Sequence, residues 1–201
     1  MDRAGLIREL ESRGVLGDAN VRRAFREVDR AMFVPSDQRE FAYENRPLPI
    51  GEGQTISQPL TVAIMTEALD VGAGHKVLEV GTGSGYQAAI ISKIIGASGR
   101  LVTIEARKSL ADFARGNLSN FDNIEIVDGD GCMGYVARAP YDRIIVTASA
   151  SKVPNVLVSQ LREGGIMVLP IKDRVYRIVK RKTGLGIRSL GCFLFVPLKE
   201  D

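Results

Sequence analysis

The sequence has one histidine and two cysteines among its 201 residues. Because His75 is the single histidine, a metal site built from several histidines is excluded, and a Ser-His-Asp hydrolase would depend on one loop residue that we expect at the surface. Cys132 and Cys192 lie far apart and form no C-x-x-C pair, so the sequence indicates neither a zinc site nor a thioredoxin-like redox site. We therefore expect reduced thiols and no bound metal.

Long apolar runs are also missing. No stretch approaches the roughly 18 to 20 consecutive apolar residues that span a bilayer, and residues 1–11 carry charges where a signal peptide has an apolar region. We therefore expect a cytoplasmic protein without a membrane partner. The formal net charge of +3 is small and dispersed, so it does not by itself indicate nucleic acid as a partner.

The composition is that of a globular protein, with 45% hydrophobic and 25% charged residues. A chain of this length can bury one core, so we predict a single domain over residues 1–201. Residues 1–58 are expected to hold N-terminal helices and a long loop, and residues 59–201 the rest of the domain. The loop, residues 39–58, shows no periodicity but carries aromatic and apolar side chains, which favours a functional loop over a disordered one.

Hydrophobic periodicity predicts an α/β fold. Leu6, Ile7 and Leu10 form one helical stripe and Asp18 precedes another, so the N-terminus is a helical extension. After the loop and a further helix, the expected strands are 76–80, 100–105, 124–127, 142–147 and 166–170, and the expected helices are 86–95, 108–118 and 153–162. This alternation predicts a doubly wound, mostly parallel sheet with helices on both faces. The last apolar runs, 175–181 and 187–198, are too close for a crossover helix and should pair antiparallel.

A glycine-rich turn joins the first predicted strand to the helix at 86–95. Its glycines, Gly81, Gly83 and Gly85, give G-x-G-x-G, whereas a dinucleotide fingerprint would be G-x-G-x-x-G; position 86 is a bulky tyrosine. A nicotinamide-dependent dehydrogenase is therefore disfavoured. Glycines at this edge of a sheet let the backbone approach a ligand closely, and Glu79 just before them is suited to a cationic amino group.

Acidic residues end or follow the next two predicted strands. Glu105 stands 20 residues after Gly85, where a carboxylate can accept hydrogen bonds from both ribose hydroxyls. Asp130, in the segment Asp-Gly-Asp-Gly, is placed to reach an adenine amino group. Each motif alone is equally typical of a turn or a cap. Together and in this order they resemble the class I methyltransferases, which implies S-adenosylmethionine as cofactor and S-adenosylhomocysteine as product.

A longer resemblance begins ahead of these motifs. The segment Gly51-Glu-Gly-Gln-Thr-Ile-Ser-Gln-Pro resembles the G-x-G-Q-T-I-S-Q-P hallmark of the protein-L-isoaspartate O-methyltransferases, and the similarity covers residues 20 to 170, with a weaker echo in Phe195-Val-Pro-Leu. It implies a seven-stranded, Rossmann-like methyltransferase sheet. It also implies a cytosolic, usually monomeric enzyme that methylates the free α-carboxylate of L-isoaspartyl residues in damaged proteins and peptides, after which the ester collapses to a succinimide.

The resemblance also implies roles for individual residues. Ser57 corresponds to the active-site hydroxyl of the family. The implied substrate-binding residues are Gln54, Thr55, Ile56, Ser57 and Gln58, and the implied cofactor-binding residues are Glu79, Gly81, Thr82, Gly83, Gly85, Glu105, Asp130 and Gly131. Two positions depart from the family pattern: Asn45 replaces the usual Asp, and Ser149 interrupts a Thr-Ala-Ala-Ala run.

Such chemistry needs little from the protein. A free carboxylate has a reference pKa near ~3.5, so the nucleophile is ionised at neutral pH and no strong general base is needed. Orientation then contributes up to ~7 to 11 kcal/mol, and the Ser57 hydroxyl is suited to orient a carboxylate. The alternative is that Ser57 caps a helix starting near Pro59, a role that can coexist with binding.

Two other functions stay open. The first is methylation of RNA or a small molecule, which the basic residues near the C-terminus would favour; these are Lys172, Arg174, Arg177, Lys180, Arg181 and Lys182. Because apolar residues alternate with these charges, a solvated strand face is the better interpretation, and we expect no nucleic-acid partner. The second is a non-catalytic cofactor-binding module, against which the intact cofactor motifs and the segment 54–58 argue.

Overall fold

The computed structural model describes residues 1–198, and the last three residues of the predicted domain lie outside this range. The N-terminal segment forms the expected helices, α1 (Arg3–Ser12) and α2 (Ala19–Glu27). Asp18 caps α2, because its carboxylate accepts hydrogen bonds from the amides of Asn20 and Val21. Two 3₁₀ helices follow, η1 (Arg30–Phe33) and η2 (Ser36–Phe41).

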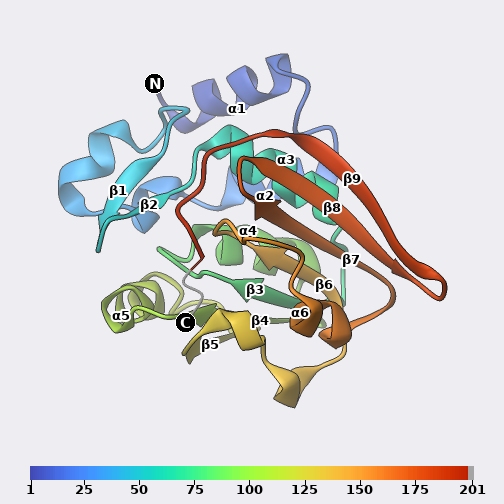
Figure 1. The fold of residues 1–201 in the computed structure, drawn as a ribbon. Coiled ribbons are helices and arrows are strands. Elements are labelled where there is room, and N and C mark those ends of the chain that lie inside the picture. Colours follow the sequence, from blue (N-terminus) through green and yellow to red (C-terminus); the bar gives the residue numbers. More distant parts are fainter. Residues whose placement is uncertain (199–201) are drawn as a thin grey trace.

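A seven-stranded sheet forms the centre of the molecule, with the strand order β5-β4-β3-β6-β7-β8-β9 (Figure 1). The five strands β3 to β7 are parallel, and β8 and β9 complete the sheet through antiparallel pairs. The strands are β3 (Lys76–Val80), β4 (Arg100–Glu105), β5 (Ile124–Asp128), β6 (Tyr141–Val146), β7 (Leu161–Ile171), β8 (Arg174–Arg181) and β9 (Gly184–Cys192). Because β3 pairs with β4 on one side and with β6 on the other, the strand order reverses at β3, where open α/β sheets bind ligands.

Alternate side chains of the strands enter two hydrophobic clusters. Val77 and Ile145 belong to the cluster that also includes the helices α3 (Pro59–Leu69), α4 (Tyr86–Ile95) and α5 (Lys108–Asn117). The N-terminal helices α1 and α2 pack outside α3 and α4 (Figure 1). Leu78 and Ile144 point to the other face, which is covered by the short helix α6 (Asn155–Gln160) and by η3 (Gly131–Met133) and η4 (Val136–Arg138).

The segment 39–58 is more regular than its sequence suggests. It begins inside η2 and continues into a two-stranded antiparallel hairpin, β1 (Leu48–Gly51) and β2 (Gln54–Ile56). The turn has positive φ angles at Gly51, Glu52 and Gly53. The expectation of an irregular loop was therefore wrong. The sequence did not reveal the hairpin because strands of four and three residues are too short to show a period-two pattern.

The C-terminal third also differs from the expected boundaries. The helix expected at 153–162 is limited to α6, because β7 already begins at Leu161. The antiparallel pairing of the last two runs is confirmed, but β9 ends at Cys192. From Phe193 to Leu198 the chain leaves the sheet edge and runs beside the loop after β6, where Ser149 exchanges backbone hydrogen bonds with Val196 and Leu198, both of 2.8 Å.

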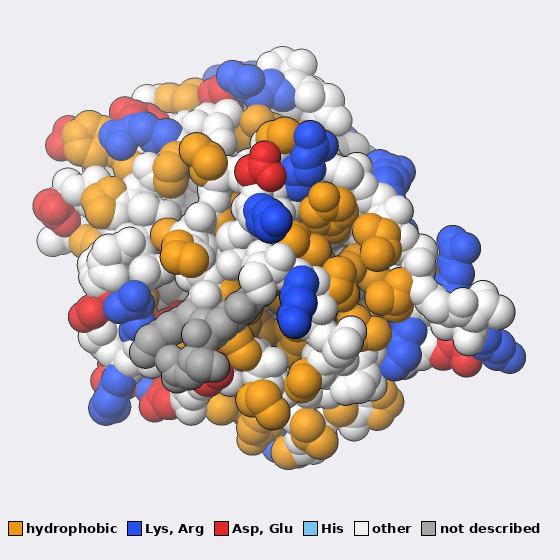
Figure 2. All heavy atoms as spheres, in the orientation of Figure 1, with side chains coloured by type: hydrophobic (Ala, Val, Ile, Leu, Met, Phe, Trp, Pro, Cys, Tyr) orange, Lys and Arg blue, Asp and Glu red, His pale blue; other side chains and the backbone are white. Residues whose placement is uncertain are grey.

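The basic residues near the C-terminus divide between the two faces of the sheet. Arg177 donates to the carbonyl of Ala68 in α3, at 2.8 Å, whereas Lys180 donates to the carbonyls of Val158 and Leu161 on the α6 side. On the face shown in Figure 2, Lys and Arg side chains are scattered among hydrophobic and uncharged ones. Within residues 1–198, no helix combines the length and apolarity needed to cross a bilayer.

Candidate active site

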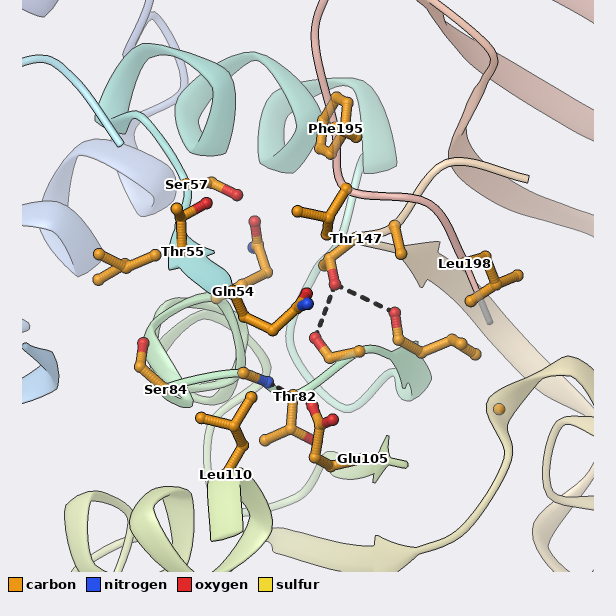
Figure 3. A pocket seen from close by; sticks show the side chains of 18 of the residues that line it. Gln54, Thr55, Ser57, Thr82, Ser84, Glu105, Leu110, Thr147, Phe195 and Leu198 are labelled. Atoms are coloured by element: carbon orange, nitrogen blue, oxygen red, sulfur yellow. Dashed lines mark hydrogen bonds between the residues drawn. The ribbon is translucent and has the colours of Figure 1, made fainter. Parts of the chain in front are cut away.

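A cavity opens at the carboxyl ends of the central parallel strands, where the topology places a ligand site. It is partly open to solvent and is lined by both apolar and polar side chains, as sites for small molecules usually are. Its walls come from the hairpin, α3, the turn after β3, the end of β4 and the C-terminal segment (Figure 3). The predicted residues that line it are Gln54, Thr55, Ile56, Ser57, Gly81, Thr82, Gly83, Glu105, Asp130 and Gly131.

The glycine turn after β3 requires glycine for two different reasons. Gly81, Gly83 and Gly85 all have positive φ angles, of 96°, 54° and 88°. At Gly81 space is also limiting: a Cβ atom would lie 2.3 Å from Oγ1 of Thr147, whose hydroxyl donates to the Gly81 carbonyl at 2.6 Å. Gly85 is the N-cap of α4 and does not line the cavity; a Cβ atom there would lie 2.8 Å from Cδ1 of Leu118.

Glu105 ends β4 with its carboxylate at the cavity. Oε2 accepts a hydrogen bond from the amide of Gly83 at 2.8 Å, and Oε1 accepts from the amide of Arg107 at 3.0 Å. Each carboxylate oxygen can accept a second hydrogen bond. Glu105 is therefore held in one orientation by the backbone and retains acceptor capacity toward the cavity.

Asp130 and Gly131 form the rim of the cavity after β5. Oδ1 of Asp130 accepts from the amide of Cys132 at 2.8 Å and caps η3. A Cβ atom on Gly131 would lie 2.3 Å from Cγ1 of Val80, so only glycine lets this rim approach β3 so closely. The two residues thus bring an acidic side chain to the edge of the cavity beside the glycine turn.

Glu79 is placed differently from the other predicted cofactor residues. It is completely buried and does not line the cavity. Its Oε2 accepts from the Thr103 hydroxyl at 2.5 Å, and Thr103 Oγ1 lies 2.7 Å from Oγ1 of Thr82, which does line the cavity. Within the described chain, Oε1 has no hydrogen-bond partner. Burial, opposed by the Thr103 bond and reinforced by Glu105, raises the pKa of Glu79 from 4.5 to about 8.

This raised pKa predicts how stability depends on pH. Between pH 4.5 and about 8 the folded state retains the Glu79 proton that the unfolded state has lost, so this residue makes the free energy of unfolding fall as pH rises through that window. Urea unfolding of the wild type and Glu79→Gln from pH 5 to 8.5 measures the effect. We expect the free energy of unfolding of the wild type to fall relative to that of the variant as pH rises through this window; two parallel curves would contradict it.

The predicted substrate segment forms one wall of the cavity, with Phe195 and Leu198 on the other side (Figure 3). Gln58 turns away from it, since its Nε2 donates to the Asn45 carbonyl at 2.9 Å. Ser57 is partly exposed, and no described residue forms a hydrogen bond with its hydroxyl. The Ser57 cap was a wrong alternative: the N-cap of α3 is Gln58, which forms no side-chain cap bond.

Asn45, from the segment before the hairpin, bonds to a backbone amide in the first turn of α3. Its Oδ1 accepts from the amide of Leu60 at 3.1 Å, and its Nδ2 donates to Oε1 of Glu9 at 2.9 Å. An aspartate could accept the first bond but could not donate the second. The replacement of the usual Asp by Asn45 therefore allows one side chain to bond to both α1 and α3, outside the cavity lining.

Several lining residues were not predicted from sequence. The sequence gives only weak indications for them. Thr147 lies at the end of a predicted strand, and Phe195 begins the segment Phe195-Val-Pro-Leu, which resembles the family weakly and was given no role. The additional lining residues include Thr61, Val62, Met65, Ser84, Tyr86, Gln87, Arg107, Leu110, Thr147, Ala148 and Phe195 to Leu198. In residues 1–198, no three or more His, Cys, Asp or Glu side chains are grouped so that they could hold a metal ion.

Comparison with known proteins decides the family. Residues 1–201 match the family model described as Protein-L-isoaspartate(D-aspartate) O-methyltransferase (PCMT). The chain belongs to the PCMT family. The resemblance inferred from the segment 51–59 is thereby confirmed.

Relatives of the PCMT family match nearly the whole chain. A protein-L-isoaspartate O-methyltransferase of Ignicoccus hospitalis is 46% identical over 203 residues, which cover 98% of this chain and 96% of that protein. One of Methanopyrus kandleri is 48% identical over 204 residues, covering 98% and 90%. The similarity therefore extends over nearly the whole of this chain and at least 90% of each of these two relatives.

Solved PCMT structures share the fold. A protein-L-isoaspartate O-methyltransferase structure with 29% identity has a TM-score of 0.91, covering 99% of this chain and 66% of that chain. A structure described as a PCMT of Plasmodium falciparum in complex with S-adenosyl-L-homocysteine has 26% identity and a TM-score of 0.89, with full coverage of both chains. The predicted mostly parallel, seven-stranded methyltransferase sheet with antiparallel C-terminal pairing is confirmed.

Proposed function

We propose that this protein transfers a methyl group from S-adenosylmethionine to the free α-carboxylate of L-isoaspartyl residues in damaged proteins and peptides, which starts their repair through a succinimide. The observation that carries the proposal is the shared cavity: the segment Gln54–Ser57 faces the glycine turn and Glu105 across one space. A cofactor held at the turn would thus adjoin a carboxylate held at Ser57. The family resemblance supports a monomeric, cytoplasmic enzyme.

The residues around the cavity fit S-adenosylmethionine. Gly81 and Gly83 provide backbone that no Cβ covers, Glu105 retains acceptor capacity for the ribose hydroxyls, and Asp130 at the rim suits the adenine amino group. When bound, this cofactor supplies an activated methyl group on a sulfonium. The S-adenosyl-L-homocysteine complex of the Plasmodium falciparum relative supports the same assignment.

The protein's own part in the reaction is orientation. The substrate carboxylate is ionised without a base, so the chain has to hold one of its oxygens in line with the transferred group. The Ser57 hydroxyl makes no bond within the described fold and can donate to that carboxylate, with Thr55 beside it in the same wall. Neutral donors leave the carboxylate nucleophilic, whereas a full charge would stabilise the ground state. On the opposite side, Phe195 contributes an apolar wall to the cavity.

A matched peptide pair tests the function. One peptide carries L-isoaspartyl and the other normal aspartyl at the same position, and each is incubated with the protein and methyl-labelled S-adenosylmethionine. We expect base-labile methyl esters on the isoaspartyl peptide alone. Absence of label on both peptides, in a protein that binds the cofactor, would point to another methyl acceptor, and RNA would then be the first to test.

A further inference from the structure

Arg30 in η1 is a buried cation beside the substrate wall. Its side chain is 1% exposed, and among residues 1–198 it has no acidic partner within ion-pair distance. The guanidinium lies 5.9 Å from the ring centre of Tyr86, and its Nε makes no hydrogen bond with any described residue. Burial lowers the pKa of Arg30 to about 10, so the group stays charged at neutral pH.

The guanidinium binds three backbone carbonyls, which lie on two segments distant from Arg30 in sequence. Nη1 donates to the carbonyl of Ala42 at 2.6 Å, and Nη2 donates to the carbonyls of Arg46 at 3.2 Å and Ser57 at 3.0 Å. These acceptors are 12, 16 and 27 residues away in sequence. A planar fork of donors can serve three fixed carbonyls at once, which the single ammonium of lysine cannot do with the same geometry.

Burial of an uncompensated charge is costly, and apolar replacements of buried charges are often as stable. The arrangement therefore indicates a requirement for geometry more than for stability. The segment that needs this geometry is the passage from β2 to α3, where Ser57 lies between the end of the hairpin and Pro59. Because no described side chain holds the Ser57 hydroxyl, its position depends on the backbone, and Arg30 is the side chain that binds this backbone at the Ser57 carbonyl.

We propose that Arg30 is a positioning residue for Ser57: by binding the Ser57 carbonyl together with those of Ala42 and Arg46, it sets where the Ser57 hydroxyl points in the cavity. This inference rests on the proposed function, because it assumes that Ser57 orients the substrate carboxylate. Arg30 itself does not line the cavity. Its effect should therefore appear in turnover and not in cofactor binding.

Arg30→Lys tests the proposal, with Arg143→Lys as the matched control. Arg143 is also buried and donates to a backbone carbonyl, that of Asp70 at 2.8 Å, but it lies near the start of β6, away from the carboxyl ends of the strands. We expect Arg30→Lys to lower kcat on the isoaspartyl peptide by about 100-fold, as a displacement near 1 Å can do, while calorimetry gives wild-type affinity for S-adenosylhomocysteine. Arg143→Lys should keep wild-type kcat.

A double-mutant cycle separates positioning from general loss of structure. If Arg30 acts through Ser57, then Arg30→Lys should lower kcat little further once Ser57 is alanine, whereas independent effects would multiply. Multiplying effects, wild-type kcat in Arg30→Lys, or an equal loss of S-adenosylhomocysteine affinity would each overturn the proposal. If Arg30→Lys does not fold, Arg30→Gln enters the same cycle. An inactive wild type would count against the proposed function instead.

Discussion

Ser57→Ala is expected to lower kcat on an isoaspartyl peptide by about 100-fold, the loss typical of one donor that orients a reacting oxygen. The Ser57 hydroxyl makes no hydrogen bond with any described residue. In the first turn of α3, the amide of Leu60 donates to Asn45 and not to Ser57. The free energy of unfolding should therefore change by less than about 0.5 kcal/mol. Steady-state kinetics at saturating S-adenosylmethionine and thermal unfolding measure the two quantities.

A surface serine provides the control for Ser57→Ala. Ser159 is exposed in α6, and its hydroxyl bonds within the helix to the carbonyl of Val156 at 2.7 Å. Ser159→Ala should change neither turnover nor fold. If Ser57→Ala were fully active but melted at a lower temperature, Ser57 would have a structural role alone, and the proposed orientation of the carboxylate would be wrong.

Gly81→Ala should have the largest effect on the fold of the site. A φ of 96° costs a residue with a side chain ~1–3 kcal/mol, and the new Cβ would lie 2.3 Å from Thr147 Oγ1. To make room, Thr147 must give up its bonds to the carbonyls of Gly81 and Val80. We expect a loss of about 3 kcal/mol in the free energy of unfolding and much weaker binding of S-adenosylhomocysteine.

Two further variants show whether the clash or the backbone angle dominates. At Gly83, with φ 54°, the nearest atom to a new Cβ is Ile50 Cδ1 at an ordinary 3.5 Å, so Gly83→Ala should cost only about 1 kcal/mol. Adding Thr147→Ala to Gly81→Ala removes the clashing oxygen and should recover part of the stability. Equal losses for both single variants, with no recovery in the double variant, would mean that the clash is unimportant.

Sequence reasoning located most of the cavity but not the function of each residue within it. Glu105, Asp130 and the glycines were found because strand ends in a parallel sheet share one edge. Glu79 carries the same kind of signal, yet it lies beneath the cavity and reaches it only through the hydroxyls of Thr103 and Thr82. A motif places a residue along the chain, but the direction of its side chain depends on which face of β3 it occupies.

The hairpin and the C-terminal segment were less predictable. Short strands such as β1 and β2 have no detectable period, and their pairing depends on a turn of three residues with positive φ. The segment 193–198 reads as a continuation of the last strand, because its apolar residues suit a sheet as well as a cavity wall. It leaves the sheet where backbone groups of Ser149 accept and donate the hydrogen bonds that a neighbouring strand would otherwise provide.

The amino-acid sequence by itself determined the α/β alternation, the mostly parallel sheet and the motif residues of the site, because hydrophobic period, strand order and turn chemistry are local properties of the chain. The family followed from its motifs as well. Only the tertiary structure decided that Phe195 faces Ser57 across one cavity, that Asn45 bonds to the first turn of α3, and that Arg30 binds the carbonyls of Ala42, Arg46 and Ser57. These contacts join residues far apart in sequence, and no local pattern encodes which distant carbonyl a buried donor meets.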